Sequence, residues 1–337
     1  MHSRPRPVVC SRVRPSDVRH RAALAFLGCL LVILLAAAPA LGDEAAPTGR
    51  RVLGADRGRV AIVDASGRVE WEYPCRGTPH DLTLLPNGNV LFINGDREVL
   101  EVTPEKQVVW RHAGRPAASN TGRVEIHAAQ RLENGNTLIA ESGNRRIIEV
   151  DSQGNIAVEI PLQVDNPDPH RDTRLVRKLK SGNYLVCHEG DGKVREYDAR
   201  GQVVWSWTLD LAGRPESPGH GPEGHGTSLY SALELPSGNI LIGGGNNNRV
   251  VEVNRAGEIV WSVDQRELPG IALAWVTMVA ALPNGNVIIG NCHAGPENPQ
   301  LIEVTRDKAV VWTFRDFETF GDSLAATHVL DEPDQTR

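Results

Sequence analysis

The sequence predicts an all-β fold, a six-bladed β-propeller with four antiparallel strands in each blade. Three observations support this: a turn motif that recurs at a regular interval, apolar runs without helical periodicity, and two chain ends that complement each other. The motif is an Asn/Ser-Gly-Asn triplet, at steps of 47, 47, 56 and 47 residues, with its glycines at Gly88, Gly135, Gly182, Gly238 and Gly285. A fixed period of this size is typical of repeat architectures, and four-stranded units repeated radially describe a propeller.

Each repeat has the same order of elements. A run ending in leucine precedes the triplet, and a β-branched apolar run follows it, as in VLFI at residues 90–93. A polar loop, a strand of the form xxEV and a second tight turn come next. The final run ends in tryptophan in four of the five full units, at Trp110, Trp205, Trp261 and Trp312. We interpret the Asn-Gly pairs as type I′ turns with two positive φ angles, and the tryptophans as clamps between blades.

The two chain ends supply the sixth blade. Residues 50–74 carry the second, third and fourth strands of a unit, and residues 323–333 look like a lone first strand. Pairing them closes the ring and removes the open sheet edges that invite aggregation. The propeller is therefore expected to span residues 50–333, after a short linker at 43–49 and before a tail at 334–337.

Residues 1–42 have the pattern of a signal peptide. Six arginines come before or at the start of the apolar stretch AALAFLGCLLVILLAAAPALG, which ends in small residues. We therefore expect a periplasmic or secreted protein. The apolar stretch also approaches the length of a membrane span, so an uncleaved anchor is the alternative, and membrane association is expected only if this segment is retained.

Charge and cysteine content narrow the functional classes. Residues 1–42 contain six arginines and one aspartate, so the remaining 295 residues hold 30 basic and 41 acidic side chains, a net charge of −11 with histidine neutral. Such a chain is a poor candidate for binding nucleic acid. Cys75, Cys187 and Cys292 are too few for a disulfide framework, and Cys187 is expected to be a buried apolar residue. We expect a monomer.

The candidate site lies on the face with variable loops. Seven residues before the Asn/Ser of each triplet, the inner strands carry His80, His127, Arg174, Tyr230 and Thr277, which should lie at matching heights near the channel mouth. Second strands end at His188 and His293, and the crossovers that enter the same rim contain His170, Arg171, His220 and His225. Trp275 lies near this mouth and could stack on a ligand. The sequence thus predicts a funnel rich in histidine and arginine.

Several interpretations of this funnel stay open. The side chains could be polar rim groups that bond neighbouring loops, or they could bind a small anionic or carbohydrate-like ligand. They could also catalyse group transfer or elimination, with candidate catalytic residues His80, His127, Arg174, His225 and His293. The candidate ligand-binding residues are His188, Tyr230, Trp275, His170, Arg171 and His220. A metal ion held by imidazoles is a variant without compact ligand spacing, and a protein partner on the 210–230 loop is a further alternative.

Two segments carry a family resemblance. HAAQRLENGNTLIAESGNRRIIEVDSQG (127–154) and LPSGNILIGGGNNNRVVEVNRAGEIVW (235–261) resemble blades of bacterial arylsulfotransferase-like propellers and of the wider PQQ-like repeat superfamily. The resemblance implies a six-bladed exported enzyme in which channel histidines and an arginine act, one histidine carrying the sulfuryl group. His80, His127, Arg174, His225 and His293 match those residue types. PQQ itself is not expected, because the repeats lack the fuller docking pattern of quinoprotein dehydrogenases.

Overall fold

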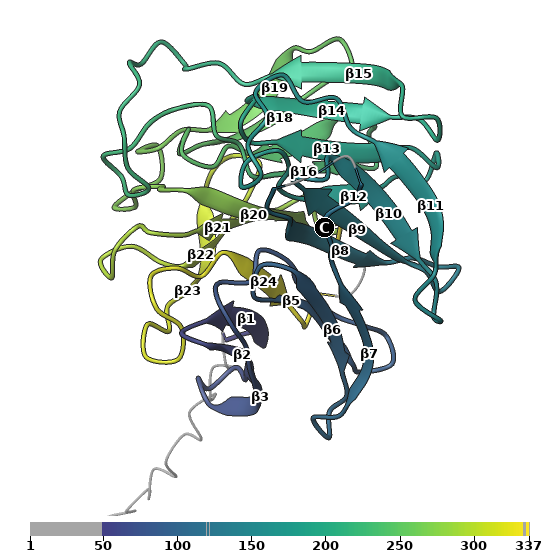
Figure 1. Cartoon of the computed structure of the whole chain (residues 1–337). Coiled ribbons are helices and arrows are strands. Elements are labelled where there is room, and N and C mark those ends of the chain that lie inside the picture. Colours follow the sequence, from purple (N-terminus) through teal and green to yellow (C-terminus); the bar gives the residue numbers. More distant parts are fainter. Residues whose placement is uncertain (1–48, 119, 121, 333–334, 337) are drawn as a thin grey trace, which may run out of the picture. The chain divides into compact units, whose positions relative to one another are not determined.

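The computed structural model describes residues 49–332 except 119 and 121, together with residues 335 and 336. The proposed signal peptide, and all of the proposed linker except Gly49, lie outside the described residues. Within these residues, twenty-four strands form six antiparallel four-stranded sheets, as predicted (Figure 1). No helix within the described part of the chain is long and apolar enough to cross a bilayer.

Blades 1, 2 and 3 follow one another along the chain, except that β24 comes from the C-terminal end. The strands of each blade are given from the innermost outward. Blade 1 is β24 (Ala326–Val329), β1 (Val52–Asp56), β2 (Arg59–Val63) and β3 (Val69–Pro74). Blade 2 is β4 (Leu82–Leu84), β5 (Val90–Asn94), β6 (Glu98–Val102) and β7 (Val108–Ala113). Blade 3 is β8 (Glu125–Arg131), β9 (Thr137–Ser142), β10 (Arg146–Val150) and β11 (Ile156–Pro161).

The remaining blades follow the same order. Blade 4 is β12 (Val176–Lys178), β13 (Tyr184–His188), β14 (Lys193–Tyr197) and β15 (Val203–Thr208). Blade 5 is β16 (Ser231–Glu234), β17 (Ile240–Gly243), β18 (Val250–Val253) and β19 (Ile259–Val263). Blade 6 is β20 (Val276–Ala281), β21 (Val287–Asn291), β22 (Leu301–Val304) and β23 (Val310–Phe314). Second strands such as β5 are buried throughout, whereas outer strands such as β7 alternate, because only one of their faces packs on a neighbour.

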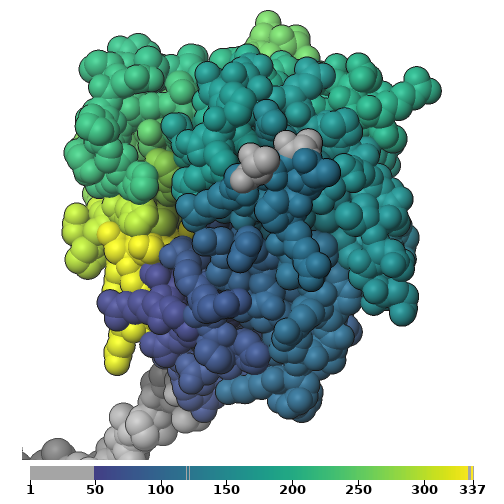
Figure 2. Space-filling view, in the orientation of Figure 1, coloured from purple at the N-terminus to yellow at the C-terminus, as the bar shows by residue number. Residues whose placement is uncertain are grey.

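Blade 1 closes the ring as the sequence predicted. β24 pairs antiparallel with β1, with Leu53 opposite His328 and Gly54 opposite Thr327. The purple N-terminal strands and the yellow C-terminal segment accordingly lie side by side in Figure 1 and on the surface in Figure 2. The tail runs back against the propeller, since Thr336 and Ala281 exchange backbone hydrogen bonds of 2.9 and 3.0 Å.

The type I′ interpretation of the triplets is wrong. Only the glycine has a positive φ, 84° at Gly88, while Asn87 does not. The Gly88 amide donates to the Leu85 carbonyl and the Leu85 amide to the Asn89 carbonyl, which is a three-residue type I loop with glycine in the bulge position. The loop has three residues and needs a single positive φ, at the bulge position that glycine occupies, and Gly135 and Gly182 adopt it without a preceding Pro-Asn or Pro-Ser pair.

Each residue of the triplet has a separate role. The side-chain oxygen of the first residue accepts the amide of the third, as from Asn89 to Asn87 at 3.0 Å. The amide of the third side chain donates to the glutamate of the xxEV strand, at 2.6 Å from Asn89 to Glu101. The next blade adds a cation to that glutamate, in the pairs Glu101–Arg131, Glu149–Lys178, Glu196–Arg255, Glu252–Arg306 and Glu303–Arg50. The triplet is therefore part of a contact that recurs between neighbouring blades. We call this set of asparagine, glutamate and cation the inter-blade lock.

The tryptophans clamp blades together, as predicted. The indole N–H of Trp71 donates to the Pro104 carbonyl in the outer turn of blade 2, and Trp205 donates to Arg255 in blade 5, both at 3.0 Å. The guanidinium of Arg255 also lies over the Trp205 ring, 5.4 Å from its centroid, and adds a cation–π contact. Cys187 in β13 is fully buried, which confirms its prediction as an apolar core residue.

Candidate functional site

The inner strands bring four of the five register-matched residues together. His80 precedes β4, His127 lies in β8, Arg174 precedes β12 and Tyr230 precedes β16, so four consecutive blades contribute. The His80 ring centroid is 4.8 Å from that of His127 and 6.0 Å from that of Tyr230. The fifth residue, Thr277, is buried in β20, and its hydroxyl has no hydrogen-bond partner among the described residues.

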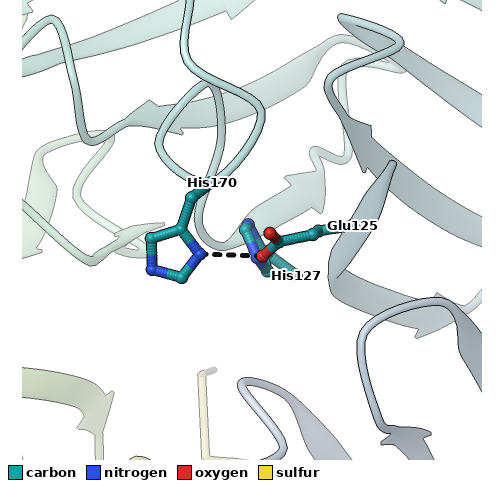
Figure 3. Close-up of side chains that lie close together, drawn as sticks. All are labelled: Glu125, His127 and His170. Atoms are coloured by element: carbon teal, nitrogen blue, oxygen red, sulfur yellow. Dashed lines mark hydrogen bonds and ion pairs between the residues drawn. The ribbon is translucent and has the colours of Figure 1, made fainter. Parts of the chain in front are cut away.

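A β-bulge in β8 aims the central histidine. The pairing with β9 shifts between Ile126 and Ala128, so His127 is the extra residue with no partner across the ladder. A bulge of this kind re-aims a side chain. Glu125 lies two residues away, and its Oε2 is 2.9 Å from His127 Nε2, so the carboxylate and imidazole face each other (Figure 3).

Glu125 holds two histidines and one arginine. Its Oε2 also accepts from His170 Nδ1 at 2.8 Å, and its Oε1 lies 2.7 Å from Arg123 Nε. Burial alone would raise the pKa of this carboxyl, but the hydrogen bonds from His127 and His170 outweigh it and hold the pKa below its usual range. Glu125 is therefore an ionised anchor, while the exposed His170 side chain reaches it from the crossover between β11 and β12.

Arg174 is a buried side chain that holds neighbouring side chains in place. Its Nε lies 2.5 Å from Glu189 Oε2, its Nη2 donates to His170 Nε2 at 3.0 Å, and only 3% of its side chain is exposed. Because an arginine only donates, His170 Nε2 is an acceptor, and the proton of that ring is on Nδ1, where it faces Glu125. Burial, followed by the charge of Arg174, lowers the pKa of His127 to about 4. Arg174 thus positions the imidazoles and has little surface for a ligand.

His80 has one bonded and one open ring nitrogen. Its Nδ1 is 2.8 Å from Tyr230 Oη, and that hydroxyl donates to the His80 carbonyl at 3.4 Å. Burial raises the pKa of Tyr230 well above its usual value, so the phenol stays protonated. Burial, then the charge of Arg174 and the neighbouring imidazoles, lowers the pKa of His80 well below 6.5. Nε2 has no hydrogen-bond partner among the described residues, and it keeps a free lone pair in the tautomer whose proton is on Nδ1.

A second group lies where blades 5 and 6 meet the funnel. The His220 ring, from the 210–230 crossover, is 4.2 Å from Trp275 and 5.5 Å from His293, centroid to centroid. Trp275 and His293 have φ angles of 36° and 57°, a costly backbone conformation for such residues that often occurs at functional positions. Burial, then the neighbouring His220, lowers the pKa of His293. Within the described residues, no recorded ring contact or hydrogen bond joins this group to Glu125.

Three predicted residues have other surroundings. The His188 ring is fully buried between the Asp172 carbonyl, 2.8 Å away, and Tyr197 Oη, 2.9 Å away. His225 is buried in the long crossover, where its Nε2 donates to the Leu211 carbonyl at 2.8 Å. Arg171 is half exposed and donates to Ser228 Oγ at 2.7 Å. Strand register gives the height of a residue but not the side to which its ring points.

Sequence reasoning missed the two carboxylates, Glu125 and Glu189. Glu125 had a usable signal, because residues two apart on a strand point to the same face, and Glu125-Ile126-His127 has that spacing. Glu189 follows β13 directly, so its position at the end of a second strand places it at the same rim as His188.

The cluster offers one candidate set of metal ligands. Single ligand atoms of Glu125, His127 and His170 lie within 4.8 Å of one another. The Thr173 carbonyl, 2.7 Å from His127 Nδ1, suits a metal-ligating imidazole. Arg174 does not, because its bond to His170 Nε2 keeps the proton on the His170 atom that faces Glu125. The described contacts therefore fit protons shared between Glu125 and the two imidazoles better than a bound cation.

Comparison with known proteins supports the fold. No protein-family model and no curated protein sequence matches the chain. A protein of unknown function from Bacteroides caccae has a similar structure, with a TM-score of 0.69 and 25% identity over 83% of this chain and 98% of that one. A streptogramin B lyase has a TM-score of 0.54 at 14% identity, covering 77% of each chain. A catalytically inactive virginiamycin B lyase variant from Staphylococcus aureus, with quinupristin, has a TM-score of 0.52 at 11% identity, covering 82% and 87%. These likenesses establish the β-propeller fold.

Proposed function

We propose that the protein is an exported lyase for a small anionic or carbohydrate-like molecule, and that His80 is its general base. The observation that carries the proposal is the open Nε2 of His80 on a ring whose pKa is lowered. We assign the hydroxyl hydrogen of Tyr230 to the His80 carbonyl, so that Tyr230 accepts the proton on Nδ1 and Nε2 keeps its lone pair. A base needs a free lone pair within reach of substrate, and its ring must be oriented from the other nitrogen.

The exposed arginine of the cluster favours an anion. Arg123 pairs with Glu125 and Asp96, and Arg171 and Arg174 pair with Glu189, so the fixed charges of this group balance. Of these arginines, Arg171 is 42% exposed and can reach a ligand. Its planar fork suits a carboxylate, and it would stabilise the negative charge that develops when an adjacent carbon loses a proton.

The proposed step is an elimination. His80 Nε2 takes the proton from the carbon next to a carboxylate, and the C–H electron pair becomes the new C=C bond. The oxygen on the following carbon leaves with the electrons of its C–O bond and takes a proton from water. His80 then returns its proton to solvent, so the reaction needs no oxidant or cofactor.

The second candidate is sulfuryl transfer of the arylsulfotransferase type, favoured by the same open nitrogen. His80 Nε2 would bond to the sulfur of an aryl sulfate while the phenolate leaves, and an acceptor hydroxyl would then take the sulfuryl group. The elimination ranks first because Arg174, which would have to contact the sulfuryl oxygens, is buried against Glu189 and His170.

The experiment compares wild type with His80→Gln and Tyr230→Phe. With oligogalacturonate as substrate, ultraviolet absorbance reports the conjugated double bond, and we expect His80→Gln to lose about a hundredfold or more in rate. Tyr230→Phe should lower kcat and leave KM nearly unchanged, because it removes only the partner that orients the base. A covalent His80 adduct after incubation with an aryl sulfate would instead support the transferase. Rates equal to wild type in His80→Gln would refute both.

A further inference from the structure

A second polar site lies on the funnel face of blade 2. The crossover after β3, the loop between β5 and β6 and the residues after β7 enclose a cleft of about 540 Å³. Its charged lining consists of Arg76, Asp96, Arg97, Glu98 and Arg115. None of these residues takes part in the chemistry proposed for His80.

The cleft has an excess of positive charge. Glu98 is held by Arg76 at 2.9 Å and by the Asn94 amide at 2.7 Å, and Asp96 is paired with Arg123 at 3.1 Å. The exposed side chains of Arg97 and Arg115 have no hydrogen-bond or ion-pair partner within the described residues. Two free guanidinium groups in a chain with excess acidic residues indicate a site for oxyanions, which arginine binds with two parallel hydrogen bonds.

The floor of the cleft is bare backbone. Gly77, Gly95 and Gly114 line it, and the first two have φ angles of 64° and 69°. A Cβ on Gly77 would come within 3.6 Å of the Gly95 Cα, so any side chain there would narrow the cleft. Among the described residues, no aromatic side chain lines it, which is unfavourable for stacked nucleobases. Peptide groups and free guanidiniums suit a chain rich in hydroxyls with carboxylate or sulfate groups.

The cleft is joined to the catalytic cluster. Arg123 bonds Asp96 of the cleft through Nη2 and Glu125 of the cluster through Nε, at 3.1 and 2.7 Å. The Ile126 amide, next to Glu125, also donates to the Asp96 carbonyl at 2.7 Å. The cleft and Glu125 are therefore held together through Arg123 and the Ile126 amide.

We propose that the cleft is a subsite for an acidic oligosaccharide, with Arg97 and Arg115 binding its carboxylate or sulfate groups while one end reaches the funnel. The inference rests on the proposed function for the substrate class only. It predicts recognition of an extended chain, so a longer acidic oligosaccharide should bind more tightly than its monosaccharide.

The test is equilibrium binding in the His80→Gln background, where turnover does not interfere. Titration calorimetry with oligogalacturonate, chondroitin sulfate and neutral cello-oligosaccharide should show binding of at least one acidic probe, weakened by salt, and none of the neutral chain. The double change Arg97→Ala and Arg115→Ala should weaken binding about tenfold or more, whereas Arg200→Ala, an exposed arginine in an outer turn, should not.

Several results would overturn the inference: unchanged affinity in the double variant, equal binding of the neutral chain, or no binding of either acidic probe. The first would place the ligand elsewhere, and the second would remove the role of charge. The two proposals fail separately, since the double variant measures the cleft without catalysis and His80→Gln measures the base.

Discussion

The two faces of the propeller are built from the same inner strands but obey different rules. On the face of the Asn-Gly turns, one arrangement recurs: the third triplet residue and a cation from the next blade meet on a buried glutamate, as Asn89 and Arg131 do on Glu101. On the funnel face, His127, Arg174 and Tyr230 occupy equivalent positions with unlike side chains. The repeated glutamate contacts stabilise the scaffold, and the residues that differ between blades can provide a functional site on it.

The largest loss of stability is expected when the glutamate of one inter-blade lock is removed. Glu252 is buried, and it accepts from Asn239 at 2.6 Å and pairs with Arg306 of the next blade. Glu252→Ala leaves both partners without an acceptor, so the free energy of unfolding should fall by about 3 kcal/mol. Denaturant unfolding measures it. Arg97→Ala on the funnel face is the matched control and should change stability by less than about 0.5 kcal/mol. Equal losses in both would remove the distinction between the faces.

The next largest effect should be a loss of folding stability in acid, caused by histidines that are buried on the funnel side. Burial lowers the pKa of His188 to about 4, against 6.5 for an exposed imidazole. As pH falls from 6.5 towards 4, the unfolded chain takes up a proton that the folded chain refuses, so stability falls by about 1.4 kcal/mol per pH unit. Above pH 6.5 the residue contributes no pH dependence.

The change His188→Gln isolates this contribution. It should flatten the slope of unfolding free energy against pH between 4 and 6.5 by about 1.4 kcal/mol per unit, whatever its effect on absolute stability. Urea unfolding at several pH values gives the slope. A slope unchanged from wild type would mean that His188 is not held neutral in the fold.

The smallest effect is expected at a single clamp. Trp205→Phe keeps an aromatic ring beneath Arg255 but removes the 3.0 Å hydrogen bond to the Arg255 carbonyl. The loss should be about 1 kcal/mol, measurable as a lower unfolding midpoint at constant m-value. A loss as large as that of Glu252→Ala would show that the tryptophans, and not the glutamates, carry the inter-blade contacts.

The sequence predicted the architecture because its repeats report it directly. Gly88 and its equivalents fixed the blade period, and the incomplete ends at Arg50 and Pro333 implied the closing strand. The turn type was predicted wrongly because the Asn-Gly pair was taken as a two-residue loop, whereas the loop has three residues and ends at the glycine.

Register alone could predict the heights of side chains and little more. It placed His80, His127, Arg174 and Tyr230 at one level, where the structure brings them together. It could not show that the His188 ring turns towards Tyr197, nor that Arg174 is enclosed by Glu189. Those outcomes depend on which side of the strand faces the channel and on partners from other blades.

The account depends most on His80 presenting an unprotonated nitrogen to the funnel, and modification by diethylpyrocarbonate with peptide mass spectrometry tests this without any substrate. The reagent attacks accessible neutral imidazoles, so His80 should react and should stay reactive well below pH 6.5, because its pKa is lowered. The buried His188 should be protected. A His80 that is protected in the folded protein, or whose reactivity disappears near pH 6.5, would contradict the account.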